Sequence, residues 1–295
     1  MIPGITVDYG ATPLNCENSH LLGIESFVGG ASDGKIGIAV MRYTNPVTKS
    51  LHWQKTWFFL NDDVQHVMIA ALSSKSGASV RSVLDQRRAS GRILIDGSEV
   101  RSTSRSGCRT LWHGNVGYKF DDPDVSLKVQ REQKNGDWSK IGTSTQPPVT
   151  VDMFTAFIEH GPLESSVSYS VFPGADADAF NKKSDNLRLQ SVQNDAHASA
   201  IYDGSHDTLM AAFWDASGGS VTFTPDHSNA PITISVDGNA AVIYKLKAGE
   251  VTLSDPSQTL STIRVTLSSG RRNARTLTFT LPQGGLAGSS VTQST

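Results

Sequence analysis

The sequence predicts an all-β protein, and three observations lead to that class. Short segments with the two-residue period of strands recur along nearly the whole chain. Turn residues separate these segments at the spacing expected of β-sandwiches. Helical periodicity is almost absent, since Val80–Leu84 is a candidate for one helical turn but is too short to assign.

The first predicted strands follow a turn signal near the N-terminus. Pro3 and Gly4 form that signal, and a β-type segment comes directly after them. Lys55–Leu60 is apolar on both faces, which predicts a strand buried between two layers. Arg92–Ile95 ends at Asp96-Gly97, a strong hairpin signal. The other expected strands are Ile36–Met41, His66–Leu72, Ser126–Arg131, Val151–Glu159, Val167–Phe172, Leu187–Val192, His197–Tyr202, Thr208–Trp214, Gly219–Pro225, Pro231–Val236, Ala240–Leu246, Ser261–Leu267 and Arg275–Leu281.

A polar stretch divides the chain into two predicted domains. Pro173–Asp178 follows a strand, and the strands after it are shorter and richer in Thr and Ser. We therefore expect a first domain over 1–178 and a second over 179–284. The Gly/Ser/Thr-rich segment 285–295 is expected to form a flexible tail.

The charge balance argues against a nucleic-acid-binding protein. The chain has 26 Lys and Arg residues against 28 Asp and Glu residues, a formal net charge of −2, whereas nucleic-acid binders usually carry a basic excess or stripe. No apolar run reaches the roughly 18 residues that cross a bilayer. The N-terminus also lacks the basic start and apolar stretch of a signal peptide. We expect neither nucleic acid nor a membrane as a partner.

The sequence predicts no metal and no cofactor. Asp176 and Asp178 could bind calcium, but the third acidic position and the glycine of an EF-hand loop are missing, which favours a solvated linker. No Cys/His cluster suggests zinc, and no glycine-rich phosphate loop appears. Cys16 and Cys108 are the two cysteines, and the sequence leaves open whether they form a disulfide or two free thiols.

Seven short segments, taken together and in order, carry a resemblance to a known family. They are Ile2–Thr6, Phe27–Gly34 with the strand Ile38–Met41 after it, Lys55–Asp62, Trp112–Tyr118, Phe154–Gly161, Tyr169–Gly174 and Leu253–Gln258. Their order is similar to that in the β-portion of polysaccharide lyase family 8, which includes hyaluronate, chondroitin AC and xanthan lyases. The resemblance implies a large antiparallel β-supersandwich followed by a smaller C-terminal β-sandwich. In the family, an α-helical toroid precedes both.

The resemblance also implies that the family's catalytic groups lie outside this chain. The catalytic Asn, His, Tyr and Arg of the family lie on the toroid, and an active-site Glu precedes the Pro-Gly stretch with which this chain starts. β-Elimination needs a base, an acid and a group that stabilises the enolate-like charge. Asn15–Asn18 resembles the surroundings of that Glu but follows the Pro-Gly pair, so we interpret it as a polar loop. His113 as a base, Tyr118 as an acid and His160 are interpreted as structural residues. We therefore expect no catalytic residue.

A carbohydrate-binding, lectin-like protein is the first functional hypothesis. Sugar binding needs an aromatic platform with polar neighbours. Trp57 and Trp214 lie in strand patterns and are expected in the core, whereas other tryptophans lie nearer loops. The Arg87-Arg88 pair is interpreted as solvated, with binding of an acidic ligand as the alternative. The candidate carbohydrate-binding residues are Trp53, Trp112, His113, Asn115, Trp138, Arg87 and Arg88.

Two other hypotheses stay open. The first is that the chain is the non-catalytic β-part of a secreted lyase that cleaves uronate-containing glycans by β-elimination. Alternatively, unpaired strand edges could form a homo-oligomer, which is compatible with sugar binding. The expected location depends on whether the chain is part of a lyase. A lyase parent would be extracellular, while a self-standing chain without a signal peptide would stay in the cytosol or leave by an unusual route.

Overall fold

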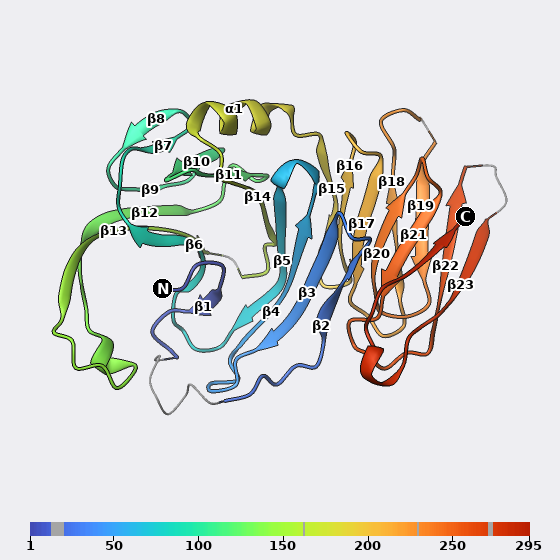
Figure 1. The fold of residues 1–295 in the computed structure, drawn as a ribbon, viewed down its shortest axis with the longest axis horizontal. Helices are drawn as coiled ribbons and strands as arrows, with labels where there is room; N and C mark the ends of the chain where they lie inside the picture. Colours follow the sequence, from blue (N-terminus) through green and yellow to red (C-terminus); the bar gives the residue numbers. More distant parts are fainter. Residues whose placement is uncertain (13–20, 162, 229, 271–273) are drawn as a thin grey trace. The chain divides into compact units, whose positions relative to one another are not determined.

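The computed structural model describes residues 1–12, 21–161, 163–228, 230–270 and 274–295 (Figure 1). Strands dominate this part of the chain, and the one α-helix within it is α1 (Ala177–Asn186). Three short 3₁₀ segments accompany them: η1 (Asn61–Asp63), η2 (Trp138–Lys140) and η3 (Gly284–Leu286). The all-β prediction is confirmed. No helix in the described ranges is long and apolar enough to cross a membrane.

The strands form four antiparallel sheets. A five-stranded sheet has the order β1 (Thr6–Asp8), β6 (Val80–Arg88), β13 (Val149–His160), β12 (Leu127–Gly136), β9 (Thr103–Arg105). A nine-stranded sheet has the order β2 (Val28–Ser32), β3 (Gly37–Thr44), β4 (Leu51–Phe59), β5 (Gln65–Ser74), β14 (Val167–Pro173), β11 (Val116–Phe120), β10 (Thr110–His113), β7 (Ile93–Ile95), β8 (Ser98–Val100).

The two remaining sheets belong to the C-terminal part. The six-stranded sheet has the order β15 (Leu189–Asn194), β16 (Ala198–Asp203), β17 (Thr208–Phe213), β20 (Ala240–Lys245), β21 (Glu250–Ser254), β24 (Val291–Ser294). The four-stranded sheet has the order β18 (Gly219–Phe223), β19 (Ile232–Val236), β22 (Thr262–Ser269), β23 (Arg275–Thr280). Their apolar faces share one core, in which Phe213, Phe223 and Phe279 are buried. Trp214 is also buried, as the sequence predicts.

The chain divides into two compact units that alternate along the sequence. Unit 1 consists of Met1–Ile24, Tyr43–Trp53 and Leu72–Lys182, and unit 2 consists of Glu25–Arg42, Gln54–Ala71 and Lys183–Thr295. The predicted domains 1–178 and 179–284 remain a prediction.

The two faces of the five-stranded sheet of unit 1 carry different side chains. Leu127 and Val129 of β12 are buried, as are Phe154, Ala156 and Ile158 of β13. The residues between them on β12 point the other way, because successive side chains of a strand alternate between faces. We call the side of the sheet that carries Gln130 the outer face; Thr155 and Phe157, which lie on this side too, are buried.

Two local expectations were wrong, and one segment that the sequence left unassigned is a strand. Val80–Leu84, a candidate helical turn, lies in β6, where β1 and β13 supply hydrogen-bonding partners on both sides. The segment 285–295, expected to be a flexible tail, contains β24, which pairs with β21. Asp176, expected in a solvated linker, lies at the start of α1, where its carboxylate accepts a hydrogen bond from the Ala179 amide at 2.8 Å. A side chain that satisfies a free amide in this way stabilises a helix N-terminus.

Candidate functional site

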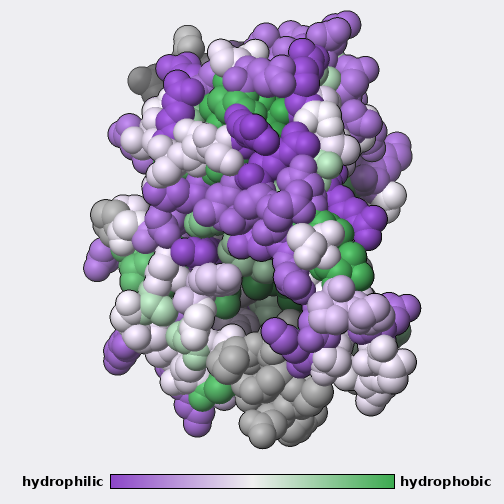
Figure 2. Space-filling view, turned by 90° about the vertical axis from the view of Figure 1, so that its left-hand side faces the viewer, coloured by the Kyte–Doolittle hydropathy of each residue, from purple (hydrophilic) through white to green (hydrophobic). Residues whose placement is uncertain are grey.

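A hollow of about 620 Å³ lies on the outer face of the five-stranded sheet. Figure 2 views the side of the molecule on which β12 and β13 lie; hydrophilic residues dominate its upper part, and its lower part mixes hydrophilic residues with residues of intermediate hydropathy. The side chains that matter for binding come from four strands or their ends: Tyr9, Arg81, Gln86, Gln130, Glu132, Lys134 and Thr155. We call this the outer-face hollow.

A row of uncharged polar side chains crosses the centre of the outer-face hollow. Gln130 of β12 pairs with Thr155 of β13, and Thr155 pairs with Gln86 of β6. Residues directly opposite each other in antiparallel strands have Cβ atoms about 5 Å apart. The side-chain amides of Gln130 and Gln86 therefore lie on either side of the Thr155 hydroxyl. Because each amide both donates and accepts, the row suits hydroxyl groups spaced along a saccharide.

A β-bulge brings Arg81 and Gln86 to the same face. They are five residues apart, and strict alternation would place them on opposite faces. The register between β6 and β13 shifts between Ala156 and Phe157, and an extra residue in one strand reverses the alternation beyond it. The cation of Arg81 thereby joins the amides in one hollow.

Aromatic rings and a carboxylate hold the guanidinium of Arg81 in place. Its central carbon lies 4.2 Å from the ring centroid of Tyr9 and 4.6 Å from that of Phe157. One of its nitrogens lies 3.6 Å from Glu159, and Nε donates to the Ser79 hydroxyl at 3.3 Å. Stacking on aromatic rings suits the planar, weakly hydrated guanidinium. The cation is therefore pre-positioned before any ligand arrives.

The Glu159 carboxylate is kept ionised beside this cation. The Ser79 hydroxyl donates to it at 2.9 Å, and that hydrogen bond is the largest cause that holds the pKa of Glu159 below its usual range. Lys128 and Arg81 act in the same direction and outweigh the opposing effect of burial. The ionised Glu159 therefore remains a charge partner of the Arg81 guanidinium.

The remaining charges of the hollow lie on β12. Lys134 and Glu132 are on the same face and form an ion pair at 2.8 Å. Both side chains are about half exposed, so water screens this pair and it contributes little to stability. An anionic ligand could therefore displace Glu132 from Lys134 at small cost. The outer-face hollow combines cations, amides and a half-exposed tyrosine ring, which is an arrangement for binding polar anions.

Four of the seven predicted carbohydrate-binding residues, Trp53, Trp112, His113 and Arg87, make internal contacts. Trp53 is buried, stacks on Tyr43 with ring centroids 4.7 Å apart, and donates its indole N–H to the Thr6 carbonyl at 3.2 Å. Trp112 is half-buried and donates to the Ala175 carbonyl at 2.9 Å.

His113 and Arg87 lie on the side of the five-stranded sheet opposite the hollow. The ring of His113 packs 4.1 Å from that of Phe154, and its Nδ1 donates to the Arg92 carbonyl at 3.0 Å. Arg87 pairs with Asp85 at 2.5 Å and donates to the Gly114 carbonyl at 3.1 Å. These contacts support structural roles for both residues.

The other three candidates are exposed but scattered. Arg88 lies opposite Met153 in the sheet register, on the outer face next to the hollow. Asn115 occupies the turn between β10 and β11 with a φ of 63°, the left-handed region that asparagine tolerates. Trp138 is 62% exposed at the tip of the β12–β13 hairpin. The structure does not bring the predicted residues together in one site.

The expectations about cysteines and metals are tested only in part. Cys108 is buried, while Cys16 and the Asn15–Asn18 loop lie outside the described residues. Pairing of the two cysteines therefore stays open. Within the described ranges, no group of three His, Cys, Asp or Glu side chains is placed to hold a metal ion.

Comparison with known proteins now identifies the family. Residues 1–184 match the super-sandwich domain of polysaccharide lyase family 8, and residues 192–264 match the C-terminal β-sandwich domain of the same family. The chain belongs to polysaccharide lyase family 8. The resemblance noted in the sequence and the predicted pair of sandwiches are thereby confirmed.

Relatives within polysaccharide lyase family 8 are considerably longer than this chain. Chondroitinase-AC of Pedobacter heparinus is 27% identical over 308 residues, which cover 98% of this chain and 41% of the relative. Hyaluronate lyase of Staphylococcus aureus is 25% identical over 183 residues, covering 59% of this chain and 22% of that protein. The chain thus spans about two fifths of the length of the first of these relatives.

Solved structures of the family share the fold. A chondroitinase AC lyase studied in enzyme–oligosaccharide complexes superposes with a TM-score of 0.85 at 25% identity, covering 99% of this chain and 43% of that one. A Paenibacillus xanthan lyase gives a TM-score of 0.84 at 20% identity, covering 99% of this chain and 30% of that one. Both sandwiches of this chain therefore follow the family architecture.

Proposed function

We propose that the chain binds acidic polysaccharides through the outer-face hollow and does not cleave them by itself. The observation that carries this proposal is the position of Arg81, held against Tyr9 beside the amide row of Gln86 and Gln130. A uronate unit offers a carboxylate to a guanidinium and hydroxyls to amides. Guanidinium groups bind carboxylates with two parallel hydrogen bonds.

The names of the relatives support an acidic saccharide as the ligand. Chondroitinase and hyaluronate lyase are named after polymers that contain a uronate in every repeat. The outer-face hollow supplies two cations, Arg81 and Lys134, against the exposed Glu132. A neutral polymer offers these cations no carboxylate or sulfate in exchange for their water-screened pairs with Glu159 and Glu132, so we expect charged polymers to bind more tightly.

A second candidate function is that of a β-part working with a catalytic helical domain. The chain covers only 41% of the chondroitinase-AC length. The tip of the β12–β13 hairpin also exposes Trp138, Ile141 and Val149, each about half exposed or more. Apolar side chains gathered at a hairpin tip suit contact with another protein surface. In this alternative the outer-face hollow would line one wall of a substrate cleft.

Two measurements separate binding from cleavage. Isothermal titration calorimetry with chondroitin and hyaluronan oligosaccharides is expected to show binding that weakens as salt rises, with dextran as the neutral control. Ultraviolet absorbance of unsaturated uronate ends is expected to stay flat during long incubation with polymer. Absence of binding to every acidic polymer would contradict the first part of the proposal, and a rising absorbance would contradict the second.

Location and self-association belong to the same proposal. Acidic polysaccharides of this kind occur outside cells, so we propose an extracellular place of action. The outer strands of the sheets in the described chain, such as β1 and β9 of the five-stranded sheet, offer edges for pairing with a second copy. Light scattering of the purified chain at several concentrations tests this: a constant monomer mass would contradict the homo-oligomer.

A further inference from the structure

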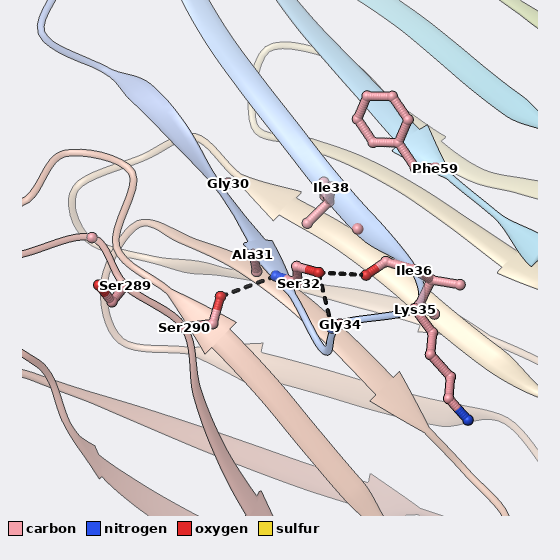
Figure 3. Close-up of a pocket in the computed structure, with 12 residues that line it drawn as sticks. Gly30, Ala31, Ser32, Gly34, Lys35, Ile36, Ile38, Phe59, Ser289 and Ser290 are labelled. Atoms are coloured by element: carbon pink, nitrogen blue, oxygen red, sulfur yellow. Dashed lines mark hydrogen bonds between the residues drawn. The ribbon is translucent and has the colours of Figure 1, made fainter. Parts of the chain in front are cut away.

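A second hollow, of about 580 Å³, lies in unit 2 (Figure 3). Its wall consists of the turn between β2 and β3, the end of β4, and the segment just before β24. We call it the β2–β3 hollow. The residues used below are Ser32, Gly34, Lys35, Phe59 and Ser290. None of them belongs to the outer-face hollow, which lies in unit 1.

Hydrogen bonds within the β2–β3 turn fix its shape. The Asp33 carboxylate accepts from the amides of Lys35 and Ile36, both at 2.9 Å. The Ser32 hydroxyl accepts from the Gly34 amide at 3.0 Å and donates to the Ile36 carbonyl at 3.0 Å. The turn is therefore ordered without a ligand, which lowers the entropy lost on binding.

Two further contacts attach this turn to the C-terminal sandwich. Lys245 forms an ion pair with Asp33. Burial would raise the pKa of Asp33, but the hydrogen bond from Lys245 and those from the turn amides outweigh it and lower that pKa. The Ser32 amide donates to the Ser290 hydroxyl at 2.9 Å. The floor of the hollow is thus built from segments far apart in the chain and is held on both sides.

Phe59 presents an aromatic ring to this hollow. The side chains before and after it, Phe58 and Leu60, are buried, whereas Phe59 is 46% exposed at the end of β4. A large apolar ring left open beside a cavity is a common feature of ligand sites. Figure 3 shows the ring at one end of the group of lining residues. Its exposed part is available to the C–H face of a sugar.

Lys35 supplies a cation at the other end. Figure 3 shows its ammonium group pointing away from the Phe59 ring, with the turn backbone between them. Lys35 is exposed and forms no ion pair with any residue in the described part of the chain. Gly34 leaves its backbone open, since an added Cβ would meet nothing within 4 Å, and its φ of +88° is one that other residues rarely adopt.

We propose that the β2–β3 hollow is a second saccharide site, which takes an acidic oligosaccharide of two or more units. One ring stacks on Phe59, and a carboxylate or sulfate of a neighbouring unit pairs with Lys35. This inference rests on the proposed function, since it assumes that the chain binds acidic polysaccharides. Two sites on one chain would raise the avidity for a long polymer above the affinity for a short fragment.

The test is a nuclear magnetic resonance titration of the complete chain with a chondroitin hexasaccharide. In the wild type we expect amide shifts both at 30–38 with 288–290 and around the outer-face hollow. Phe59→Ala is expected to weaken binding at the β2–β3 hollow about tenfold and to leave the shifts around the outer-face hollow unchanged. Phe59→Trp is expected to retain the shifts at both hollows. Lys35→Gln should reduce the salt dependence of the affinity at the β2–β3 hollow and leave that at the outer-face hollow unchanged. Leu286→Ala, at a 68% exposed side chain outside the hollow, is the matched control.

The outcomes distinguish this inference from the proposed function. Shifts around the outer-face hollow with none at the β2–β3 hollow would overturn the inference and leave the proposed function standing. Equal losses in Phe59→Ala and Leu286→Ala would also overturn it. No shift at either hollow would overturn the proposed function and the inference together. Shifts at the β2–β3 hollow that vanish in Phe59→Ala and persist in Phe59→Trp would support a stacking site.

Discussion

The guanidinium of Arg81 lies 4.2 Å from the ring centroid of Tyr9, at the edge of a polar hollow on the five-stranded sheet. This pair combines the two groups that binding of an acidic sugar requires, a fixed cation and a half-exposed ring. Glu159 holds the cation from another side. The proposed function depends on this arrangement more than on any single tryptophan.

Replacement of Arg81 by lysine tests the planar guanidinium. Arg81→Lys keeps the charge but loses the two-pronged hydrogen bond to a carboxylate and much of the stacking on Tyr9. We expect affinity for a chondroitin oligosaccharide to fall about tenfold, measured by calorimetry. Arg264→Lys is the matched control, because Arg264 is exposed and paired with Asp237 in the four-stranded sheet. Similar affinities for the two variants would contradict a role for Arg81.

The amide row and Lys134 are expected to contribute differently to binding. Gln130→Leu removes a hydrogen-bonding group and should weaken binding several-fold without changing its salt dependence. Lys134→Gln removes a charge and should flatten the salt dependence. Calorimetry at two or more ionic strengths distinguishes these effects. If both variants changed the salt dependence equally, the assignment of separate roles would be wrong.

The buried Lys55 predicts an increase of stability with pH. Burial lowers its pKa from 10.5 to about 7, and its side chain is almost inaccessible. Between these two values the unfolded chain binds the proton and the folded chain does not, so the free energy of unfolding rises with pH by at most about 1.4 kcal/mol per unit. Denaturant unfolding from pH 7 to 9 should therefore show a difference of about 2 kcal/mol in this rise between wild type and Lys55→Met. Identical pH profiles would show that Lys55 is not buried as described.

The close packing of Gly117 in β11 against α1 leaves no room for a larger side chain at position 117. A Cβ atom added there would lie 2.1 Å from a ring carbon of Phe180, which is buried. Overpacking of this kind typically costs about 2 kcal/mol, so Gly117→Ala should lower the midpoint of thermal unfolding. Gly136→Ala is the control, because its new Cβ would meet only the Val149 carbonyl at 3.9 Å. In a Phe180→Ala background the Gly117→Ala change should cost little, and an undiminished cost would place the clash elsewhere.

The sequence predicted most strands because alternation is a local property. Lys55–Leu60, expected to be buried between layers, lies in β4, and Arg92–Ile95 with its Asp-Gly turn gave β7 and the hairpin to β8. Val80–Leu84 could not be assigned from the sequence because its spacing is local, while its strand partners β1 and β13 are distant in the chain. The seven motifs identified the family because they are spread along most of the chain, so that their order adds information that no single segment contains.

The candidate site could not be predicted in the same way. Tyr9, Arg81 and Gln130 meet through strand pairings between remote segments, and the bulge at Ala156 and Phe157 overrides the alternation that a reader would apply to β6. Trp53 was expected near a loop, yet it packs on Tyr43 inside unit 1. Tyr9 is the one residue of the hollow that the sequence could have indicated. It follows a short strand and precedes a glycine, a pattern that indicates an aromatic ring at a turn.

A crystal structure of the chain with a bound chondroitin or hyaluronan hexasaccharide would test the central claim most directly. We predict a uronate carboxylate against the guanidinium of Arg81, with sugar hydroxyls on Gln86 and Gln130. A saccharide bound only at the exposed Trp138, or an outer face that stays empty at saturating ligand, would contradict the account.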